Sequence, residues 1–383
     1  MRARTKAPAA VDLDIDQLIA DRSKSIVICC GAGGVGKTTM SASLAVRAAE
    51  AGRRVVVLTI DPARRLAQSL GIADLDNTPR PVSGIDTTAG GSLDAMMLDM
   101  KRTFDDVVLA QTTPDKAQQI LGNPFYRALS TTFSGTQEYM AMEKLGQLHA
   151  QARADDRWDL IVVDTPPARS ALDFLDAPEH LAALLDGRFL RLLLAPARGP
   201  FRLMSAGFNL VLSAMNKILG GQILSDMQTF VRAFEALFGG FRQRAEQTLR
   251  LLNSHTTTFL VVAAAERDAL REAAYFVDRL REESMPMAGV VVNRVHHSDV
   301  ALSAGRAAAL AEDLAETDPT SPEAVALQLH ATRMRTIERE QLLLSRFVTP
   351  RAGLAVQPVR ALATDVTDLD ALRQVGRLLA DEH

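Results

Sequence analysis

The sequence predicts an α/β fold in which a mostly parallel central sheet is flanked by helices. An apolar run at residues 26–30 leads through a glycine-rich turn into a helical stretch at residues 40–50. Further apolar runs follow along the chain, most of them succeeded by a helical pattern, and two runs end in a carboxylate, Asp61 and Asp164. Continuous apolar strands that alternate with helices are typical of a parallel sheet buried on both faces.

The glycine-rich turn has the spacing of a phosphate-binding loop. Residues 31–39 read Gly-Ala-Gly-Gly-Val-Gly-Lys-Thr-Thr and match Gly-x-x-x-x-Gly-Lys-Thr in a strand–loop–helix context, which disfavours a chance glycine turn. Glycines let backbone N–H groups surround a phosphate, and the positive end of the helix dipole faces the same anion. We expect Lys37 to bridge the β- and γ-phosphates of ATP and the Thr38 hydroxyl to bind Mg²⁺. The predicted nucleotide-binding residues are Gly33, Gly34, Val35, Gly36, Lys37, Thr38 and Thr39.

Two carboxylates follow buried strands predicted at residues 54–60 and 158–164. Asp61 stands at the carboxyl end of the first strand, which is the edge where open α/β sheets bind ligands. Asp164 ends the second strand, and beside a phosphate loop such a residue can hold Mg²⁺ through a water. The alternative for Asp164 is a helix N-cap or a turn residue, and its pairing with the loop favours the metal role.

Composition excludes several classes of protein. The net charge of -3 argues against nucleic acid as the main partner. The two cysteines, Cys29 and Cys30, are adjacent, which predicts neither a disulfide framework nor a zinc site but two small residues at a strand end. Residues 1–24 are polar without an apolar core, so we expect a loose tail, no signal peptide and a cytoplasmic protein.

One helical insertion is predicted within a single domain that spans residues 25–383. A strand is expected at residues 92–98, helices at 100–155, strands at 258–265, 288–294 and 354–358, and helices at 266–283, 300–346 and 369–380. The insertion, at about residues 181–255, is rich in Met and Phe at helical spacing. Such a face can be ordinary core, a dimer interface or an adaptable surface for an apolar partner. Arginines that precede it also allow peripheral contact with anionic lipid at the inner face of the membrane.

From about residue 25 to the C-terminus, the chain resembles the family of ATPases that drive arsenite pumps and deliver tail-anchored membrane proteins. Residues 31–39 match the deviant Walker A loop of this family at all positions but one. Residues 61–63 match its first switch, and residues 164–167 with several following positions resemble its second switch. The resemblance implies that Asp61 positions the attacking water, that Glu266 and Asn293 contact the nucleotide, and that Asn293 reads the adenine. It further implies a dimer that closes over two ATP molecules, with a groove for a client helix in the insertion.

The chain departs from the family pattern at several positions. The second loop residue of the family is a lysine that reaches the phosphates of the partner subunit, and here it is Ala32. Residues 64–65 are Arg-Arg and residues 168–171 are Ala-Arg-Ser-Ala, where the family has other switch residues. No Cys-x-x-Cys is present, so the interfacial zinc of some relatives is not expected. The arsenite-binding cysteines of the family are also missing, so a direct arsenite-sensing role is not expected.

These observations predict a Mg²⁺-dependent ATPase that acts as a dimeric switch and binds an apolar helix or a membrane-protein partner. Because Ala32 replaces the lysine, a heterodimer with a lysine-bearing paralogue is favoured over a homodimer, and the chain alone is expected to hydrolyse ATP weakly. The alternatives are a surface-positioning ATPase of the partition or cell-division type, and a weakly active regulatory subunit of an ATPase complex.

Overall fold

The computed structural model describes residues 12–61, 65–123, 126–127, 136–166 and 243–380, without the side chains of 136–138. Contact clustering divides the chain into two compact units. The first contains residues 1–97, 155–171 and 252–383, and the second contains residues 98–154 and 172–251. Of the predicted insertion, residues 181–242 lie outside the described residues, and residues 243–252 are helical.

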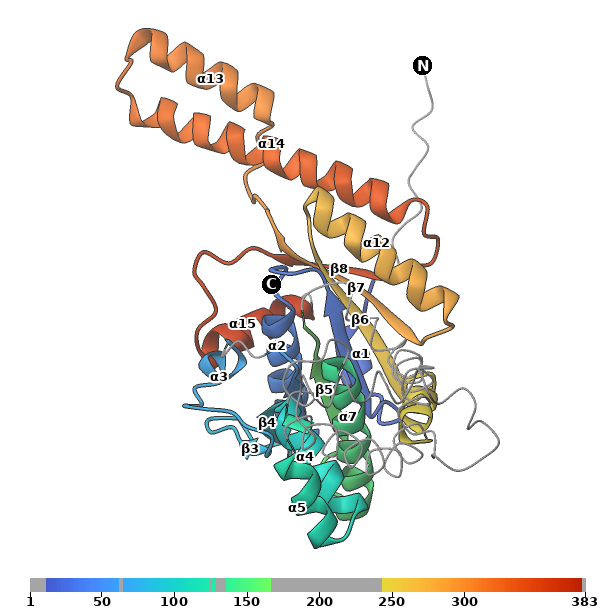
Figure 1. Cartoon of the computed structure of the whole chain (residues 1–383). Coiled ribbons are helices and arrows are strands. Elements are labelled where there is room, and N and C mark those ends of the chain that lie inside the picture. The colour runs from blue at the N-terminus through green and yellow to red at the C-terminus, as the bar shows by residue number, and fades with distance from the viewer. Residues whose placement is uncertain (1–11, 62–64, 124–125, 128–135, 167–242, 381–383) are drawn as a thin grey trace, which may run out of the picture. The chain divides into compact units, whose positions relative to one another are not determined.

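An eight-stranded sheet forms the centre of the first unit, with the order β3-β4-β2-β5-β1-β6-β7-β8 (Figure 1). All its neighbouring strands are parallel except β3 and β4. The mostly parallel sheet predicted from the apolar runs is therefore confirmed. The strands are β1 (Ile26–Gly31), β2 (Arg54–Thr59), β3 (Arg80–Pro81), β4 (Ser92–Met97), β5 (Leu160–Asp164), β6 (Thr257–Ala264), β7 (Met287–Val295) and β8 (Val356–Arg360).

Pro358 explains why β8 stands at the edge of the sheet. It pairs in register with Val292 of β7, and no strand pairs with the other side of β8 among the described residues. Proline has no N–H to donate, so sheets tolerate it on an edge strand and rarely in the interior.

The helices of this unit cover both faces of the sheet. The helices of the unit are α1 (Ile15–Ala20), α2 (Lys37–Glu50), α3 (Arg65–Ser69), α12 (Arg267–Glu282), α13 (Ala304–Thr317), α14 (Pro322–Val348) and α15 (Leu369–Leu379). Of these, α13 packs against α14 and projects away from the sheet (Figure 1). The connection from β1 through α2 leads to β2 on one side of β1, whereas the connection from β6 through α12 leads to β7 on the other side. Because such crossovers are right-handed, α2 and α12 lie on opposite faces of the sheet.

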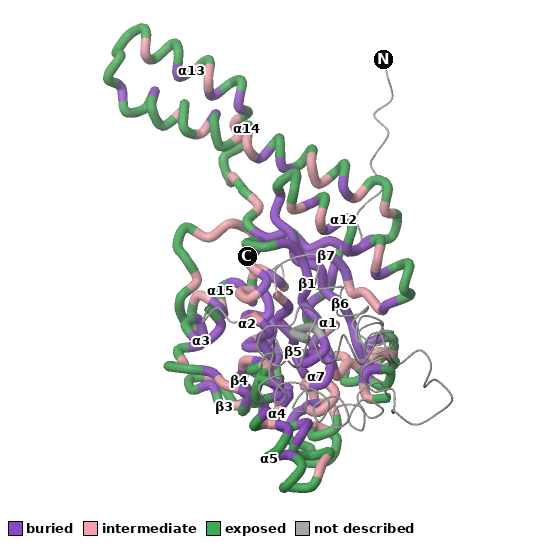
Figure 2. Tube along the Cα trace, in the orientation of Figure 1, coloured by how far each residue is buried: buried purple, intermediate pink, exposed green. Residues whose placement is uncertain are grey.

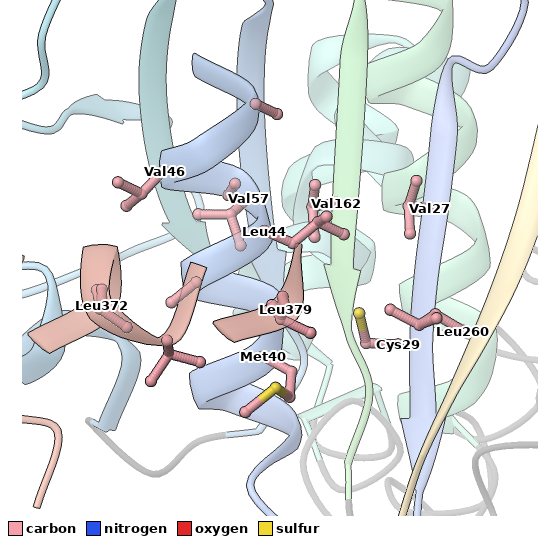
Figure 3. Close-up of a cluster of buried hydrophobic side chains, with 14 of the residues drawn as sticks. Val27, Cys29, Met40, Leu44, Val46, Val57, Val162, Leu260, Leu372 and Leu379 are labelled. Atoms are coloured by element: carbon pink, nitrogen blue, oxygen red, sulfur yellow. The ribbon is translucent and has the colours of Figure 1, made fainter. Parts of the chain in front are cut away.

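The main apolar core lies between the sheet and the helices α2 and α15 (Figures 2 and 3). Val27 and Cys29 of β1 point into this cluster together with Met40 and Leu44 of α2. Cys30 is buried too but is absent from the cluster, because successive side chains of a strand point to opposite faces. Burial raises the pKa of both thiols to about 12. Both cysteines therefore pack as small apolar residues.

The predicted tail joins this core from Leu13 onward. Leu13, Ile15 and Ile19 are buried in the same cluster as α2. Asp14 caps α1 by accepting a hydrogen bond from the backbone N–H of Gln17 at 2.8 Å. Residues 13–20 thus form part of the first unit, and residues 1–11 lie outside the described residues.

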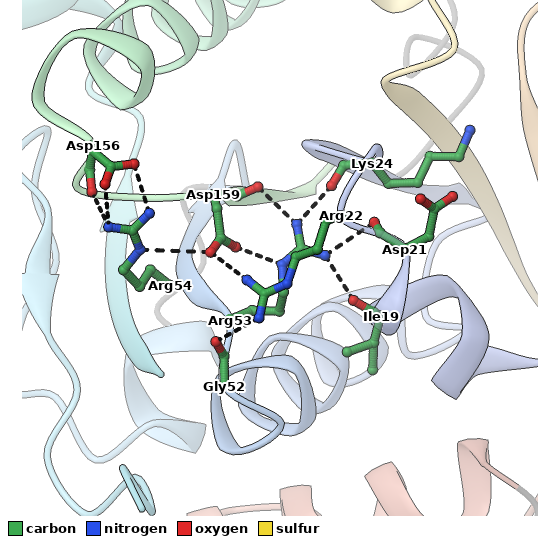
Figure 4. Close-up of polar contacts among 9 residues, drawn as sticks. All are labelled: Ile19, Asp21, Arg22, Lys24, Gly52, Arg53, Arg54, Asp156 and Asp159. Atoms are coloured by element: carbon green, nitrogen blue, oxygen red, sulfur yellow. Dashed lines mark hydrogen bonds and ion pairs between the residues drawn. The ribbon is translucent and has the colours of Figure 1, made fainter. Parts of the chain in front are cut away.

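A buried arginine fixes the chain between α1 and β1 (Figure 4). The side chain of Arg53 is 1% exposed, and its Nε donates to Oδ1 of Asp159 at 2.6 Å. Its other nitrogens donate to the carbonyl oxygens of Ile19, Asp21, Lys24 and Asp159. Planar guanidinium donors suit such a set of fixed acceptors. The N-terminal segment is therefore tied to the ends of β2 and β5 that lie away from the phosphate loop.

The second unit is helical in its described part. It contains α4 (Met100–Gln111), α5 (Pro114–Gly122), most of α7 (Thr136–Asp155) and the helical residues 243–251. Phe104 and Tyr126 pack edge to face, with ring centroids 5.5 Å apart. Arg244 donates from Nε to both carboxylate oxygens of Glu143, at 3.0 and 2.9 Å, which joins residues 243–251 to α7.

The region predicted as helix over residues 300–346 is two helices, α13 and α14, separated by residues 318–321. Ser321 caps α14 by accepting from the N–H of Ala324, and Pro322 follows as its first residue. In the part of the chain that the structure describes, no helix combines the length and the apolar character needed to cross a bilayer.

Candidate functional site

The phosphate loop connects β1 to α2 and depends on glycine at three positions. Gly31, Gly34 and Gly36 have φ angles of 147°, 75° and 95°, which side chains disfavour. A Cβ on Gly31 would stand 2.0 Å from the carbonyl oxygen of Val262, and one on Gly36 would stand 2.4 Å from Nδ2 of Asn293. The glycines that the motif predicted are thus required by backbone conformation and, at two positions, by close neighbours.

Lys37 begins α2 and is held against the loop itself. Its Nζ donates to the carbonyl oxygen of Ala32 at 2.7 Å, and the residue is 6% exposed. Desolvation lowers the pKa of the ammonium, while Asp164 opposes this shift. The amino group therefore lies inside the loop, close to where a phosphate would bind.

Asp164 lies at the centre of a hydroxyl network at the carboxyl ends of three strands. In register, β5 places it beside Cys29 of β1 and Thr59 of β2. The hydroxyl groups of Thr38 and Thr59 both donate to its Oδ2 at 2.9 Å. Its other oxygen, Oδ1, is buried and has no hydrogen-bond partner among the described residues.

Burial makes the charge on Asp164 costly in the absence of a cation. Desolvation raises the pKa of its carboxyl group to about 6, against the opposing effect of the hydrogen bonds from Thr38 and Thr59. A buried acceptor without a donor is unfavourable unless a donor or a cation reaches it. Carboxylate and hydroxyl oxygens are ligands that suit Mg²⁺, directly or through water. Asp164 and Thr38 therefore fit a magnesium site.

Thr59 links the carboxylate of Asp164 to the backbone of Asp61. The backbone N–H of Asp61 donates to Oγ1 of Thr59 at 3.2 Å, and the same hydroxyl donates to Asp164. Asp61 is half-buried. Sequence analysis missed Thr59, although a polar residue inside the buried run of β2 was a usable signal.

A cavity of about 800 Å³ opens beside the loop. Of the predicted site residues, Gly34, Gly36, Lys37, Thr38, Thr39, Asp61 and Asn293 line it. The rest of its wall, most of which was not predicted from sequence, comes from α2, α3, the residue after β5, the end of β7, β8 with the segment after it, and α15. Among these residues are Arg65, Gln68, Thr165, Arg294, His296, Arg360, Ala361, Leu362, Thr364, Asp365, Val366 and Thr367.

The two residues predicted to contact the nucleotide outside the loop, Asn293 and Glu266, lie in different surroundings. Asn293 is 7% exposed, and its Nδ2 donates to the carbonyl oxygen of Val35 at 2.9 Å, so the side chain supports the loop. Glu266 is an exposed residue that precedes α12, and it does not line the cavity. Gly33 and Val35 belong to the loop without lining the cavity. The switch residues 62–64 and 167–171 lie outside the described residues.

No cluster of three or more His, Cys, Asp or Glu side chains that could hold a metal ion by themselves occurs among the described residues. The magnesium site predicted here depends instead on one carboxylate, one hydroxyl and the phosphates of a bound nucleotide, which is a common arrangement for Mg²⁺.

Comparison with known proteins agrees with this geometry. A family model described as anion-transporting ATPase matches residues 24–309. The chain is 27% identical to the ATPase GET3 of Ajellomyces dermatitidis over 286 residues, which cover 73% of this chain and 76% of that protein. It is 26% identical to the ATPase GET3 of Kluyveromyces lactis over 293 residues, covering 74% and 76% of the two chains. For the ATPase get3 of Schizosaccharomyces pombe the identity is 25% over 285 residues, covering 73% and 76%.

Proposed function

Because the chain belongs to the anion-transporting ATPase family and is an ATPase, we propose that it works as a Mg²⁺-dependent dimeric switch that engages an apolar helix of a membrane-protein partner. The observation that carries this proposal is the network Thr38–Asp164–Thr59–Asp61, which joins the metal side of the loop to the first switch. A change in charge at Asp164 would therefore act on the backbone of Asp61 through the hydroxyl group of Thr59, which accepts from the Asp61 N–H.

In the proposed mechanism, residues of this chain bind the nucleotide, orient the attacking water and transmit the state of the site. The loop amides and Lys37 bind the phosphates, and Lys37 exchanges its bond to the Ala32 carbonyl for a phosphate oxygen. Thr38 and Asp164 would hold Mg²⁺, which would neutralise phosphate charge when bound. Asp61 orients the attacking water. The two switches are proposed to pass the state of the site to the helical insertion predicted at about residues 181–255.

The partner subunit is proposed to be a related chain rather than a second copy. A cationic side chain that reaches a transferring phosphoryl group is worth about 10³-fold or more in rate. Ala32 cannot supply it, and it is 6% exposed in the chain. A paralogue with lysine at the matching position would supply the charge to the site built on this chain.

Light scattering on the purified chain tests the switch. We expect Mg²⁺-ATP to favour the dimer, alone or with a lysine-bearing paralogue, and Lys37→Met to abolish the effect. A labelled apolar peptide of about 20 residues, long enough for a membrane-spanning helix, should then bind only in the presence of Mg²⁺-ATP. Nucleotide-dependent binding to liposomes or DNA with no effect on the peptide would instead favour a surface-positioning ATPase.

A further inference from the structure

Residues 293–296 form a bent segment at the end of β7, beside the loop cavity. The pairing of β7 with β8 shifts register between Val292 and Val295, which marks an irregularity of the bulge type. Within it, Arg294 has a φ of 59°, which a residue with a side chain rarely adopts. Bulges and left-handed residues of this kind occur preferentially next to functional sites, where they redirect side chains.

Protein contacts hold this segment at both ends. At one end, Nδ2 of Asn293 donates to the carbonyl oxygen of Val35, and Oδ1 accepts from the N–H of Arg294 at 2.9 Å. At the other end, the backbone N–H of His296 donates to Oε2 of Glu340 at 2.9 Å. The ring Nδ1 of His296 lies 2.6 Å from Oε1 of the same carboxylate. The bent segment is therefore fixed by the phosphate loop and by α14.

The contact with Glu340 determines which ring nitrogen of His296 can accept a hydrogen bond. Glu340 is 8% exposed, and both of its carboxylate oxygens contact His296. An ionised carboxylate only accepts hydrogen bonds, so Nδ1 must carry the proton. In the neutral ring, Nε2 is then the acceptor. The tautomer follows from this hydrogen-bond network.

His296 lines the loop cavity from the carboxyl end of β7. The phosphates are assigned to the loop and the start of α2, while the wall next to His296 is built from β8 and the segment after it. The N–H of Ala361 donates to the carbonyl oxygen of Val295 at 3.0 Å, which places this wall beside the bent segment. The apolar residues that line the cavity from β8, the segment after it and α15 include Val359, Leu362, Val366 and Val375. Apolar walls with a few fixed polar groups are typical of sites for flat heterocycles such as a purine.

We propose that His296 is a specificity-determining contact whose Nε2 accepts a hydrogen bond from the 6-amino group of adenine. Glu340 is a positioning residue that fixes the tautomer and the orientation of the ring. Both polar atoms of Asn293 have protein partners, whereas Nε2 of His296 has none among the described residues. The inference rests on the proposed Mg²⁺-ATP site and names the residue that distinguishes ATP from other nucleotides there.

The test is calorimetric binding of ATP and of purine riboside triphosphate, which lacks the 6-amino group, in the presence of Mg²⁺. We expect the wild type to prefer ATP by roughly five- to tenfold, as one hydrogen bond contributes. His296→Ala should remove the preference, His296→Gln should retain part of it because its amide oxygen can accept near the position of Nε2, and Glu340→Gln should reduce it. His297→Ala is the matched control, because His297 is a neighbouring exposed residue that contacts Asp299 and does not line the cavity.

Equal losses of affinity for both nucleotides in His296→Ala would overturn the proposal, as would a full preference in His296→Ala. A full preference in Glu340→Gln would overturn the positioning role. A wild type that binds both nucleotides equally contradicts only the role of His296. A wild type that binds neither contradicts the proposed Mg²⁺-ATP site as well, so the two failures are distinguishable.

Discussion

The hydroxyl group of Thr38 donates a hydrogen bond to Oδ2 of Asp164 at 2.9 Å, across 126 positions of the sequence. Both residues were selected from sequence as magnesium ligands, and parallel pairing of β5 between β1 and β2 brings them together. This arrangement lowers the stability of the nucleotide-free chain, since a buried carboxylate is kept at this position with one oxygen lacking a partner among the described residues. Several expected outcomes follow from that cost and from the loop geometry.

Asp164→Asn should stabilise the nucleotide-free chain and weaken its response to Mg²⁺-ATP. The folded-state pKa of Asp164, about 6, exceeds its ordinary value of 3.8. The folded chain therefore binds a proton that the unfolded chain releases, and its stability falls as pH rises through that window. At pH 8 the neutral amide should raise the free energy of unfolding by about 2–3 kcal/mol at most.

Urea unfolding of both proteins at pH 4.5 and pH 8, with and without Mg²⁺-ATP, measures this effect. The difference between wild type and Asp164→Asn should be larger at pH 8, and the stabilisation by Mg²⁺-ATP should be smaller in the variant. If the Asp164→Asn variant gains as much stability from Mg²⁺-ATP as the wild type does, Asp164 is not part of the metal site.

Asp61→Asn should abolish most ATP turnover while leaving nucleotide binding nearly unchanged. The amide keeps the size of the side chain but cannot accept a proton from water, and such groups contribute about 10²- to 10⁴-fold in rate. Turnover and ATP affinity should be measured together, with Asp268→Asn, an exposed residue of α12, as the control. Unchanged turnover in Asp61→Asn would refute the assignment of that carboxylate.

Gly36→Ala should destabilise the nucleotide-free chain more than Gly34→Ala does. Both positions have positive φ, at 95° and 75°, so both substitutions carry the left-handed penalty of about 1–2 kcal/mol. Only at Gly36 would the new Cβ meet a neighbour, Nδ2 of Asn293 at 2.4 Å, whereas the space at Gly34 is open. Displacing Asn293 breaks its bond to Val35, for an added cost of about 1 kcal/mol. Equal free energies of unfolding for the two variants would show that Asn293 does not support the loop.

Arg53→Met should lower the free energy of unfolding by roughly 3 kcal/mol or more, because several carbonyl oxygens and Asp159 lose a buried donor. Arg54→Met is the matched control: its neighbouring guanidinium pairs with Asp156 at the surface (Figure 4) and should contribute far less. Urea unfolding measures the free energy of unfolding of the two variants. Similar losses in the two variants would contradict the role given to Arg53.

The fold and the loop could be predicted from local patterns because they depend on local chemistry. Continuous apolar runs gave the strands, and the positions of Gly31 and Gly36 reflect backbone angles that a motif records directly. Cys29 and Cys30 were correctly interpreted as strand residues on opposite faces.

Other features could not be predicted because they depend on register and on distant segments. Thr59 acts through its place beside Asp164 in the sheet, and the wall after β8 reaches the cavity from more than 300 positions further along the chain. The contact between His296 and Glu340 joins a strand end to a helix that the sequence did not separate from α13. Only the three-dimensional arrangement places these residues at one site.

The central claim is that this chain supplies the phosphate and metal contacts of its own site but, with Ala32 in the loop, lacks the charge that a partner subunit donates. Steady-state ATP hydrolysis by the purified chain, measured alone and mixed with a paralogue that carries lysine at the matching position, tests it most directly. The account predicts that the chain alone binds Mg²⁺-ATP but turns it over slowly, and that a paralogue whose own Asp61-equivalent is replaced by Asn raises turnover by about 10³-fold. Turnover by the chain alone that equals turnover by the mixture would contradict it.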